Sequence, residues 1–148
     1  MASDPSCADG LDRFLVAQRN SYGRALAELR AGRKRTHWMW FIFPQIDGLG
    51  RSSTAQHYAI KSREEAKAFL AHPVLGERLR ECCCILQGAE ASASQIFGFP
   101  DNLKFRSSLT LFEEVADDDS LFVRLLEKFY GGQRDQTTLQ LLKQTEQS

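Results

Sequence analysis

The residue types that could bind or transform a ligand are concentrated between residues 37 and 54. This segment contains both tryptophans of the chain, one of its three histidines and the amide of Gln45. Trp38 and Trp40 could stack against a flat ligand, and the imidazole of His37 could transfer a proton near neutral pH. The segment therefore offers the parts of a small-molecule site, with His37 as a weak catalytic candidate.

A glycine-rich turn follows these aromatic residues and leads toward a helix start. Gly48 and Gly50 permit left-handed backbone angles, and Ser52 begins a run of hydroxyl residues that can cap a helix. Free amides at a helix start attract an anion, which Arg51 could neutralise. The turn lacks the lysine of a P-loop and the third glycine of a dinucleotide fingerprint, so it predicts a phosphate or carboxylate site without naming the ligand.

A second helix start, near residue 101, carries similar chemistry. Asp101 can cap this helix, Lys104 lies close to its N-terminal amides, and Ser108 follows one turn later. Both segments also have a structural interpretation, in which the aromatic residues form core, the glycines make a connector, Asp101 is only a cap and the cations are solvated. The residues alone leave both interpretations open.

Other kinds of chemistry have little support. The chain has no Cys-x-x-Cys, no His-Glu-x-x-His and no acidic calcium loop, so we expect no metal site and no cofactor. Three of the four cysteines, Cys82, Cys83 and Cys84, are adjacent, so disulfide geometry is unfavourable between them. The fourth, Cys7, falls in an expected tail. The absence of a disulfide framework favours a reducing, cytoplasmic compartment.

The charge balance limits the partners. The chain of 148 residues contains 19 Lys+Arg and 19 Asp+Glu, so no overall field draws it to nucleic acid, and we do not expect nucleic acid as a partner. The neutral total conceals a stretch from Arg24 to Lys67 in which cations outnumber acids. The longest apolar run, Trp38 to Phe43, is far shorter than the roughly 20 residues that cross a bilayer, so we expect no membrane insertion.

The hydrophobic pattern predicts an all-α, compact single-domain bundle of about six or seven helices. One amphipathic helix is expected from Leu11 to Leu29, with Glu28 off its apolar stripe and Gly32 as its stop. We expect the further helices at residues 62–70, 73–88, 101–116, 121–130 and 135–142. An irregular aromatic segment near 37–50 is either a buried helical turn or an extended stretch. We expect residues 1–10 to be a flexible tail, 11–142 to be the domain and 143–148 to be a frayed tail.

The run His-Trp-Met-Trp-x-x-Phe-Pro-Gln at residues 37–45, followed by Gly48-Leu49-Gly50, resembles a bacterial and fungal family of unknown function. Members of this family are sometimes labelled calpastatin, and an uncharacterised mycobacterial all-helical protein represents it. Further matching residues are Arg13-Phe14, Tyr58-Ala59-Ile60, His72-Pro73, Ile96-Phe97-Gly98, Asp101, Lys104, Ser107-Ser108 and Thr110-Leu111-Phe112. The resemblance implies a mainly helical domain of about this length and brings no activity, cofactor or catalytic residue. The composition is globular, unlike that of a disordered calpastatin inhibitor.

Two functions follow from this reasoning. The first is the binding of a small anionic or nucleotide-like ligand between the 37–54 segment and the helix start near 101. The alternative is a protein–protein interaction module or homodimer without catalysis, with the aromatic run as part of its contact patch.

Overall fold

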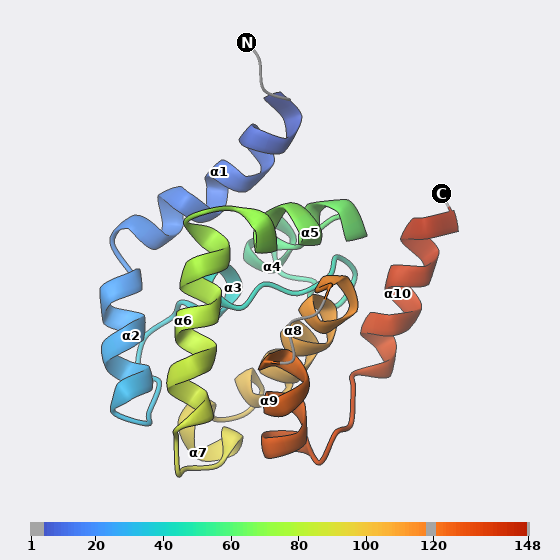
Figure 1. The fold of residues 1–148 in the computed structure, drawn as a ribbon. Helices are drawn as coiled ribbons and strands as arrows, with labels where there is room; N and C mark the ends of the chain where they lie inside the picture. Colours follow the sequence, from blue (N-terminus) through green and yellow to red (C-terminus); the bar gives the residue numbers. More distant parts are fainter. Residues whose placement is uncertain (1–4, 118–120, 148) are drawn as a thin grey trace.

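The computed structural model describes residues 5–117 and 121–147. The described residues form ten helices in one all-α domain (Figure 1). Seven helices have nine or more residues: α1 (Pro5–Arg19), α2 (Tyr22–Arg30), α5 (Arg63–Ala71), α6 (Leu75–Gln87), α8 (Asp101–Val115), α9 (Leu121–Tyr130) and α10 (Gln136–Gln147). Three are short: α3 (Met39–Ile42), α4 (Ser53–Tyr58) and α7 (Ala93–Phe97). The all-α prediction is therefore confirmed, and the expected six or seven helices correspond to the long ones.

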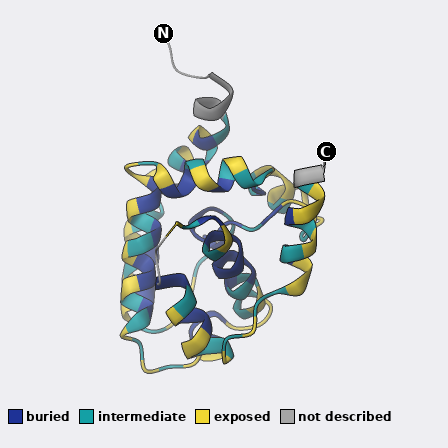
Figure 2. Cartoon of the chain, turned by 45° about the vertical axis from the view of Figure 1, so that its right-hand side comes forward, coloured by how far each residue is buried: buried dark blue, intermediate teal, exposed yellow. Residues whose placement is uncertain are grey.

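Helix α8 lies at the centre of the core. Eight of its 15 residues are buried, including Phe105, Leu109 and Phe112. It packs against α5, α7, α9 and α10, so neighbours cover it on several sides. Figure 2 shows the buried residues gathered on the inward faces of the helices. A helix enclosed in this way needs little polar surface, which explains why its apolar residues do not form a single stripe.

The prediction of one continuous helix from Leu11 to Leu29 is wrong. The chain turns at Asn20 and Ser21, so that α1 ends at Arg19 and α2 begins at Tyr22. Asn and Ser side chains compete with helical hydrogen bonds and favour turns. Helix α1 begins at Pro5, within the span expected to be a tail, and α10 continues to Gln147.

Several predicted helix boundaries are confirmed by their caps. The Ser62 side chain accepts a hydrogen bond from the Glu65 amide at 3.1 Å, and the Asp135 carboxylate accepts one from the Thr138 amide at 3.0 Å. Gly131 and Gly132, with φ of 62° and 84°, end α9. The predicted Ser120 cap lies outside the described residues. The predicted Asp101 cap is wrong, because its carboxylate makes no capping hydrogen bond at the start of α8.

The aromatic segment combines both of its expected forms. A single helical turn, α3, is followed by an extended stretch that pairs with Ile60 through one parallel bridge at Ile46. The buried Gln18 side chain donates to the carbonyl of Phe41 at 2.7 Å and accepts from Arg78 at 3.2 Å. These bonds tie α3 to α1 and α6, so the aromatic segment is held from two sides.

Candidate functional site

Two lysine–tryptophan pairs lie on either side of Asp101. The Lys34 Nζ is 2.9 Å from one Asp101 carboxylate oxygen, and the Lys104 Nζ is 3.6 Å from the other. The Lys34 ammonium lies 5.2 Å from the ring centroid of Trp38, and the Lys104 ammonium lies 5.3 Å from that of Trp40. Both distances are within the range of a cation–π contact. The structure thus brings four predicted site residues, Trp38, Trp40, Asp101 and Lys104, into one cluster.

Local structure positions the members of this cluster. Asp101 and Lys104 are three residues apart in the first turn of α8, so they share a helix face. Lys34 lies in the connection after α2, where its backbone amide donates to the Ile96 carbonyl at 2.6 Å. Its side chain is only 8% exposed, compared with 28% for Lys104. The Asp101 carboxylate is therefore shared between a buried ammonium and a more accessible one.

A buried carboxylate, Glu28, organises the inner side of the cluster. It accepts hydrogen bonds from the amides of Arg35 and Thr36, from the Thr36 hydroxyl and from the Trp38 indole. Burial by itself raises the pKa of Glu28, but the hydrogen bonds outweigh burial and lower the pKa from 4.5 to about 2. The ionised carboxylate therefore binds the backbone at Arg35 and Thr36 and the Trp38 indole at the same time, which holds the connection after α2 in place.

The two tryptophans have different surroundings. Trp38 is 1% exposed and packs against Phe43 and Phe97 with ring centroids 6.3 and 6.4 Å away. Trp40 is half-buried, and the exposed ring of His37 has its centroid 6.5 Å from that of Trp40. The aromatic run is thus core, except at Trp40, where part of an indole ring reaches the surface beside an imidazole and an ammonium.

Gln45 and Gly50 lie on another side of Trp40. The three residues line a small hollow together with Tyr58 and parts of α4, and its volume is about 10 Å³. This is room for about one water molecule. A Cβ atom at Gly50 would lie 2.5 Å from that of Ala55, so glycine permits close packing here without a positive φ. A ligand of several atoms does not fit this hollow as it stands.

The remaining residues of the glycine-rich turn have structural roles. Gly48 has a φ of 106°, which favours glycine, and faces the Leu141 side chain. Ser52 caps α4 by accepting from the Ala55 amide at 3.1 Å. Arg51 is exposed, and its carbonyl accepts from Gln56. Because α4 has six residues and its first turn is already capped, the predicted anion site at this helix start gains no support.

Ser108 lies on the same face of α8 as Asp101 and Lys104, one turn farther along. It is buried, and its hydroxyl has no hydrogen-bond partner among the described residues. The neighbouring Ser107 instead donates to the Leu103 carbonyl at 3.2 Å. A buried hydroxyl without a partner is uncommon, so Ser108 stays a predicted ligand contact.

Other reactive groups are occupied by structural roles. The Nδ1 atom of His72 accepts from the amides of Val74 and Leu75 at 3.0 and 3.2 Å, which caps the start of α6. His57 is exposed, with its ring against Tyr58. Burial raises the pKa of the Cys82 thiol to about 12, which disfavours the nucleophilic thiolate. Within the described parts of the chain, no group of histidine, cysteine and acidic side chains could hold a metal ion.

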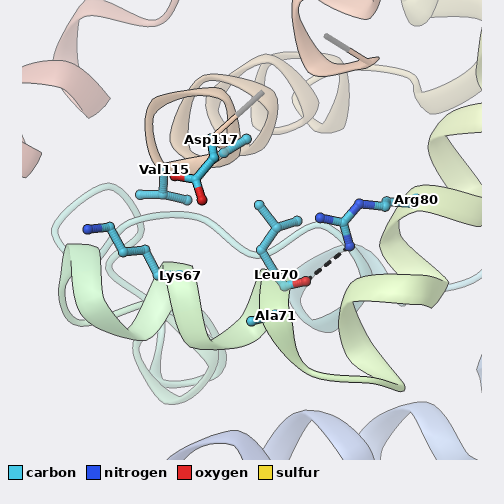
Figure 3. Close-up of a pocket in the computed structure, with 7 residues that line it drawn as sticks. Lys67, Leu70, Ala71, Arg80, Val115 and Asp117 are labelled. Carbon is cyan, nitrogen blue, oxygen red and sulfur yellow. Dashed lines mark hydrogen bonds between the residues drawn. The ribbon is translucent and has the colours of Figure 1, made fainter. Parts of the chain in front are cut away.

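A hollow of about 400 Å³ lies elsewhere, between α5, α6 and the end of α8 (Figure 3). Lys67, Leu70, Arg80, Val115 and Asp117 are among its lining residues. Arg80 donates to the Leu70 carbonyl at 3.0 Å, and Figure 3 shows the Asp117 carboxylate directed toward the space beside Lys67. None of the predicted site residues lies here.

Sequence reasoning missed two members of the cluster. Glu28 was expected off the apolar stripe, and this prediction is wrong because it is buried with Ala25 and Leu29 on the inward face of α2. Lys34 stands between Arg33 and Arg35, in a run typical of a solvated helix end. Both are charged residues, of the kind that usually lies at the surface, so no local signal shows that they are buried.

The fold is that of a small all-α domain, and its sequence matches a known family. The family model described as "Protein of unknown function (DUF1810)" matches residues 8–142. The chain belongs to the DUF1810 family. A solved structure, the conserved hypothetical protein Rv1873 from Mycobacterium tuberculosis, is 51% identical. The match covers 90% of this chain and 96% of that chain, with a TM-score of 0.88.

A search of the curated proteins finds no match. Among the described helices, none is long and apolar enough to cross a membrane.

Proposed function

We propose that this chain binds a small anionic, nucleotide-like ligand at the face formed by Trp40 and Lys104. The observation that carries the proposal is the position of the Lys104 ammonium, 5.3 Å from the Trp40 ring and 3.6 Å from the Asp101 carboxylate. An accessible cation beside a half-buried aromatic ring can contact a charged group and a planar group of one ligand.

The charge of the cluster supports an anion as the ligand. The charge of Glu28, on the inner side, is taken up by four hydrogen bonds. On the outer side, Lys34 and Lys104 contribute two positive charges and Asp101 contributes one negative charge, so one positive charge is left over there. The shorter ion pair is that of Asp101 with the buried Lys34, at 2.9 Å. The longer pair, at 3.6 Å, leaves the more exposed Lys104 as the cation that an incoming phosphate or carboxylate would meet.

The geometry also limits where the ring of a ligand would lie. The hollow beside Gln45 and Gly50 holds about one water molecule, and Trp38 is sealed in the core. A planar group would therefore contact the outer part of Trp40, next to His37. Acid–base catalysis by His37 remains a prediction that follows only if the bound ligand reaches its exposed ring.

Calorimetry with adenosine 5′-monophosphate, adenosine and inorganic phosphate tests the proposal. We expect the monophosphate to bind more tightly than either fragment, because it alone supplies both groups. Lys104→Gln and Trp40→Leu should each weaken binding about tenfold, which corresponds to one charge-assisted hydrogen bond or one stacking contact. Lys143→Gln, at an exposed position on α10, is the matched control. Equal affinity in Lys104→Gln, Trp40→Leu and the control would contradict the proposal.

Contact with another protein is the second candidate, and one observation favours it. Phe99 is 80% exposed and Leu103 is 41% exposed, at the turn before α8 and in its first turn. Homodimerisation through these side chains predicts a mass that rises with concentration in light scattering and falls to that of the monomer in Phe99→Ser. Val16→Ser, which replaces another exposed apolar residue (53%), is the control. Because the aromatic run itself is buried, it contributes little to such a patch.

The expected setting is part of the same proposal. A reducing, cytoplasmic compartment is supported by the thiols of Cys82, Cys83 and Cys84, which form no disulfide. The neutral total charge supports our expectation that nucleic acid is not the partner.

A further inference from the structure

A second polar cavity lies between α8 and the connection from α9 to α10. Its volume is about 550 Å³. It is lined by Arg106, Gly132, Gln133, Arg134, Asp135, Gln136 and Thr137, so no apolar side chain belongs to its described wall. Arg106 is two residues after Lys104 on α8, which corresponds to about 200° around the helix. The cavity therefore faces a different side of α8 from the cluster at Trp40.

The loop that forms this cavity is held firmly on α8. The Asp135 amide donates to the Thr110 hydroxyl at 3.0 Å, and that hydroxyl donates to the Arg106 carbonyl at 2.8 Å. Thr110 is fully buried, so these bonds are shielded from water. The positive φ angles of Gly131 and Gly132 reverse the chain before the loop. The polar side chains around the cavity are thus presented by a defined backbone.

The charged groups of the wall are not equivalent. The Arg134 side chain donates to the Glu113 carboxylate at 3.2 Å and to the Gly132 carbonyl at 2.9 Å, which fixes its orientation. The Asp135 carboxylate is engaged by the amide and hydroxyl of Thr138, at 3.0 and 2.5 Å. The Asp135 carboxylate therefore bonds to the first turn of α10, and Arg134 is already paired with the Glu113 carboxylate.

Arg106 differs from these groups because it has no ion-pair partner among the described residues. Its guanidinium lies 5.8 Å from the ring centroid of Tyr130, and its Nε is buried without a hydrogen-bond partner. The guanidinium is therefore partly covered by Tyr130, and no carboxylate of the described residues forms an ion pair with it. Two guanidinium groups on one cavity, of which one is unpaired, are suited to an oxyanion because they can donate several hydrogen bonds to it.

We propose that this cavity binds a compact oxyanion of the phosphate class, either inorganic phosphate or a phosphate monoester with a hydrophilic remainder. Phosphate presents several acceptor oxygens, which match the donors of Arg106, Arg134, Gln133 and Gln136. A ligand with a large apolar group would find no apolar wall here, unlike in most small-molecule sites. The site is independent of the proposed ligand face at Trp40, since the two share no residue.

Titration of the full chain with inorganic phosphate, followed by ³¹P NMR line width and by calorimetry at constant ionic strength, tests this proposal. We expect saturable binding that weakens at least tenfold in Arg106→Gln and in Arg134→Gln. Arg106→Lys keeps the charge but loses the planar fork, so it should give an intermediate affinity. Arg24→Gln, at an exposed position on α2, should bind like the unaltered chain.

Each other outcome overturns the proposal. Saturable binding that is lost in Lys104→Gln and kept in Arg106→Gln would assign phosphate to the Trp40 face instead. Absence of saturable binding would exclude the site, even if a nucleotide binds at Trp40. Circular-dichroism melts of each variant show whether it is folded. If Arg106→Gln is unfolded, Arg106→Lys and Arg134→Gln decide, and unchanged affinity in both counts against the cavity.

Discussion

Trp38 and Trp40 are two residues apart, yet they belong to regions with opposite physical character. On the inner side, Glu28 accepts four hydrogen bonds, and Trp38 is sealed against other aromatic rings. On the outer side, Asp101 is shared between two lysines, and Trp40 reaches the surface beside His37. Each region thus contains an acid, a lysine and a tryptophan. On the inner side these residues stabilise the fold, whereas on the outer side a charge and part of an indole ring are accessible.

The two regions differ in how completely their polar groups are hydrogen-bonded or paired. Every strong donor around Glu28 is used, so this region has little capacity for a ligand. The outer region has one positive charge in excess and a partly open ring.

Glu28→Ala should have the largest effect on stability. It leaves two backbone amides, a hydroxyl and an indole N–H without their acceptor, and we expect a loss of about 4 kcal/mol in the free energy of unfolding. Urea denaturation measures this loss. Glu90→Ala, at an exposed position, is the control and should change stability by less than about 0.5 kcal/mol. Similar losses in both variants would remove the distinction between the two regions.

The stability contributed by Glu28 should depend on pH. Its pKa in the folded state, about 2, lies below the ordinary value of 4.5. The ionised carboxylate therefore stabilises the fold fully above about pH 5, and this contribution is lost as the pH falls toward 2, in total about 3 kcal/mol. Glu28→Gln cannot titrate, so the gap in unfolding free energy between it and the unaltered chain should narrow over that range. A constant gap would show that the carboxylate does not carry the effect.

Lys34→Met and Lys104→Met should differ in their cost. Removal of the buried Lys34 ammonium leaves Asp101 with only its longer ion pair, and we expect a loss of about 2 kcal/mol. Lys104 is more exposed, so its loss should cost less than about 0.5 kcal/mol. Chemical denaturation of the two single variants and of the double variant measures both costs and their coupling. Equal costs would mean that Lys104 is as structural as Lys34.

The smallest expected effects concern the indole rings. Trp38→Phe removes the donor to Glu28 and should cost about 1 kcal/mol, whereas Trp40→Phe should cost less than about 0.5 kcal/mol. Since the chain has two tryptophans, each variant leaves one fluorophore. Acrylamide should quench the Trp40 that remains in Trp38→Phe more strongly than the Trp38 that remains in Trp40→Phe. Equal quenching would contradict the difference in exposure.

Much of the fold could be predicted because it depends on local rules. The stripe of Leu75, Leu79, Cys82 and Leu86 identified α6, and its burial is confirmed. The caps at Ser62 and Asp135 identified two helix starts, because a side chain oxygen three residues before an amide can satisfy it regardless of the rest of the fold. The break at Asn20 and Ser21 was missed, since the apolar spacing continues across it.

The site could be predicted only in part. Trp40 was named on one segment and Asp101 and Lys104 on another, with a ligand predicted between the two segments, but their partner Lys34 was not named. Of two tryptophans with almost the same neighbours in the chain, no local pattern indicates that one is core and the other half-buried. The Asp101 cap failed for a related reason: Pro100 occupies the N-cap position of α8, and the Asp101 carboxylate pairs with Lys34, a residue distant along the chain, at 2.9 Å.

Periodicity, caps and motifs act over a few residues, so they were sufficient to predict an all-α domain, the boundaries of most of its long helices and its family. Which charges are buried and which are accessible depends on how distant segments pack together. Lys34 pairs with Asp101, and Arg106 lies beside the loop before α10, across segments that are distant along the chain. Glu28 is buried against Trp38 because the chain folds back on itself after α2. The electrostatic role of each charged side chain depends on the solvent and the partners around it, and these follow from packing rather than from residue type.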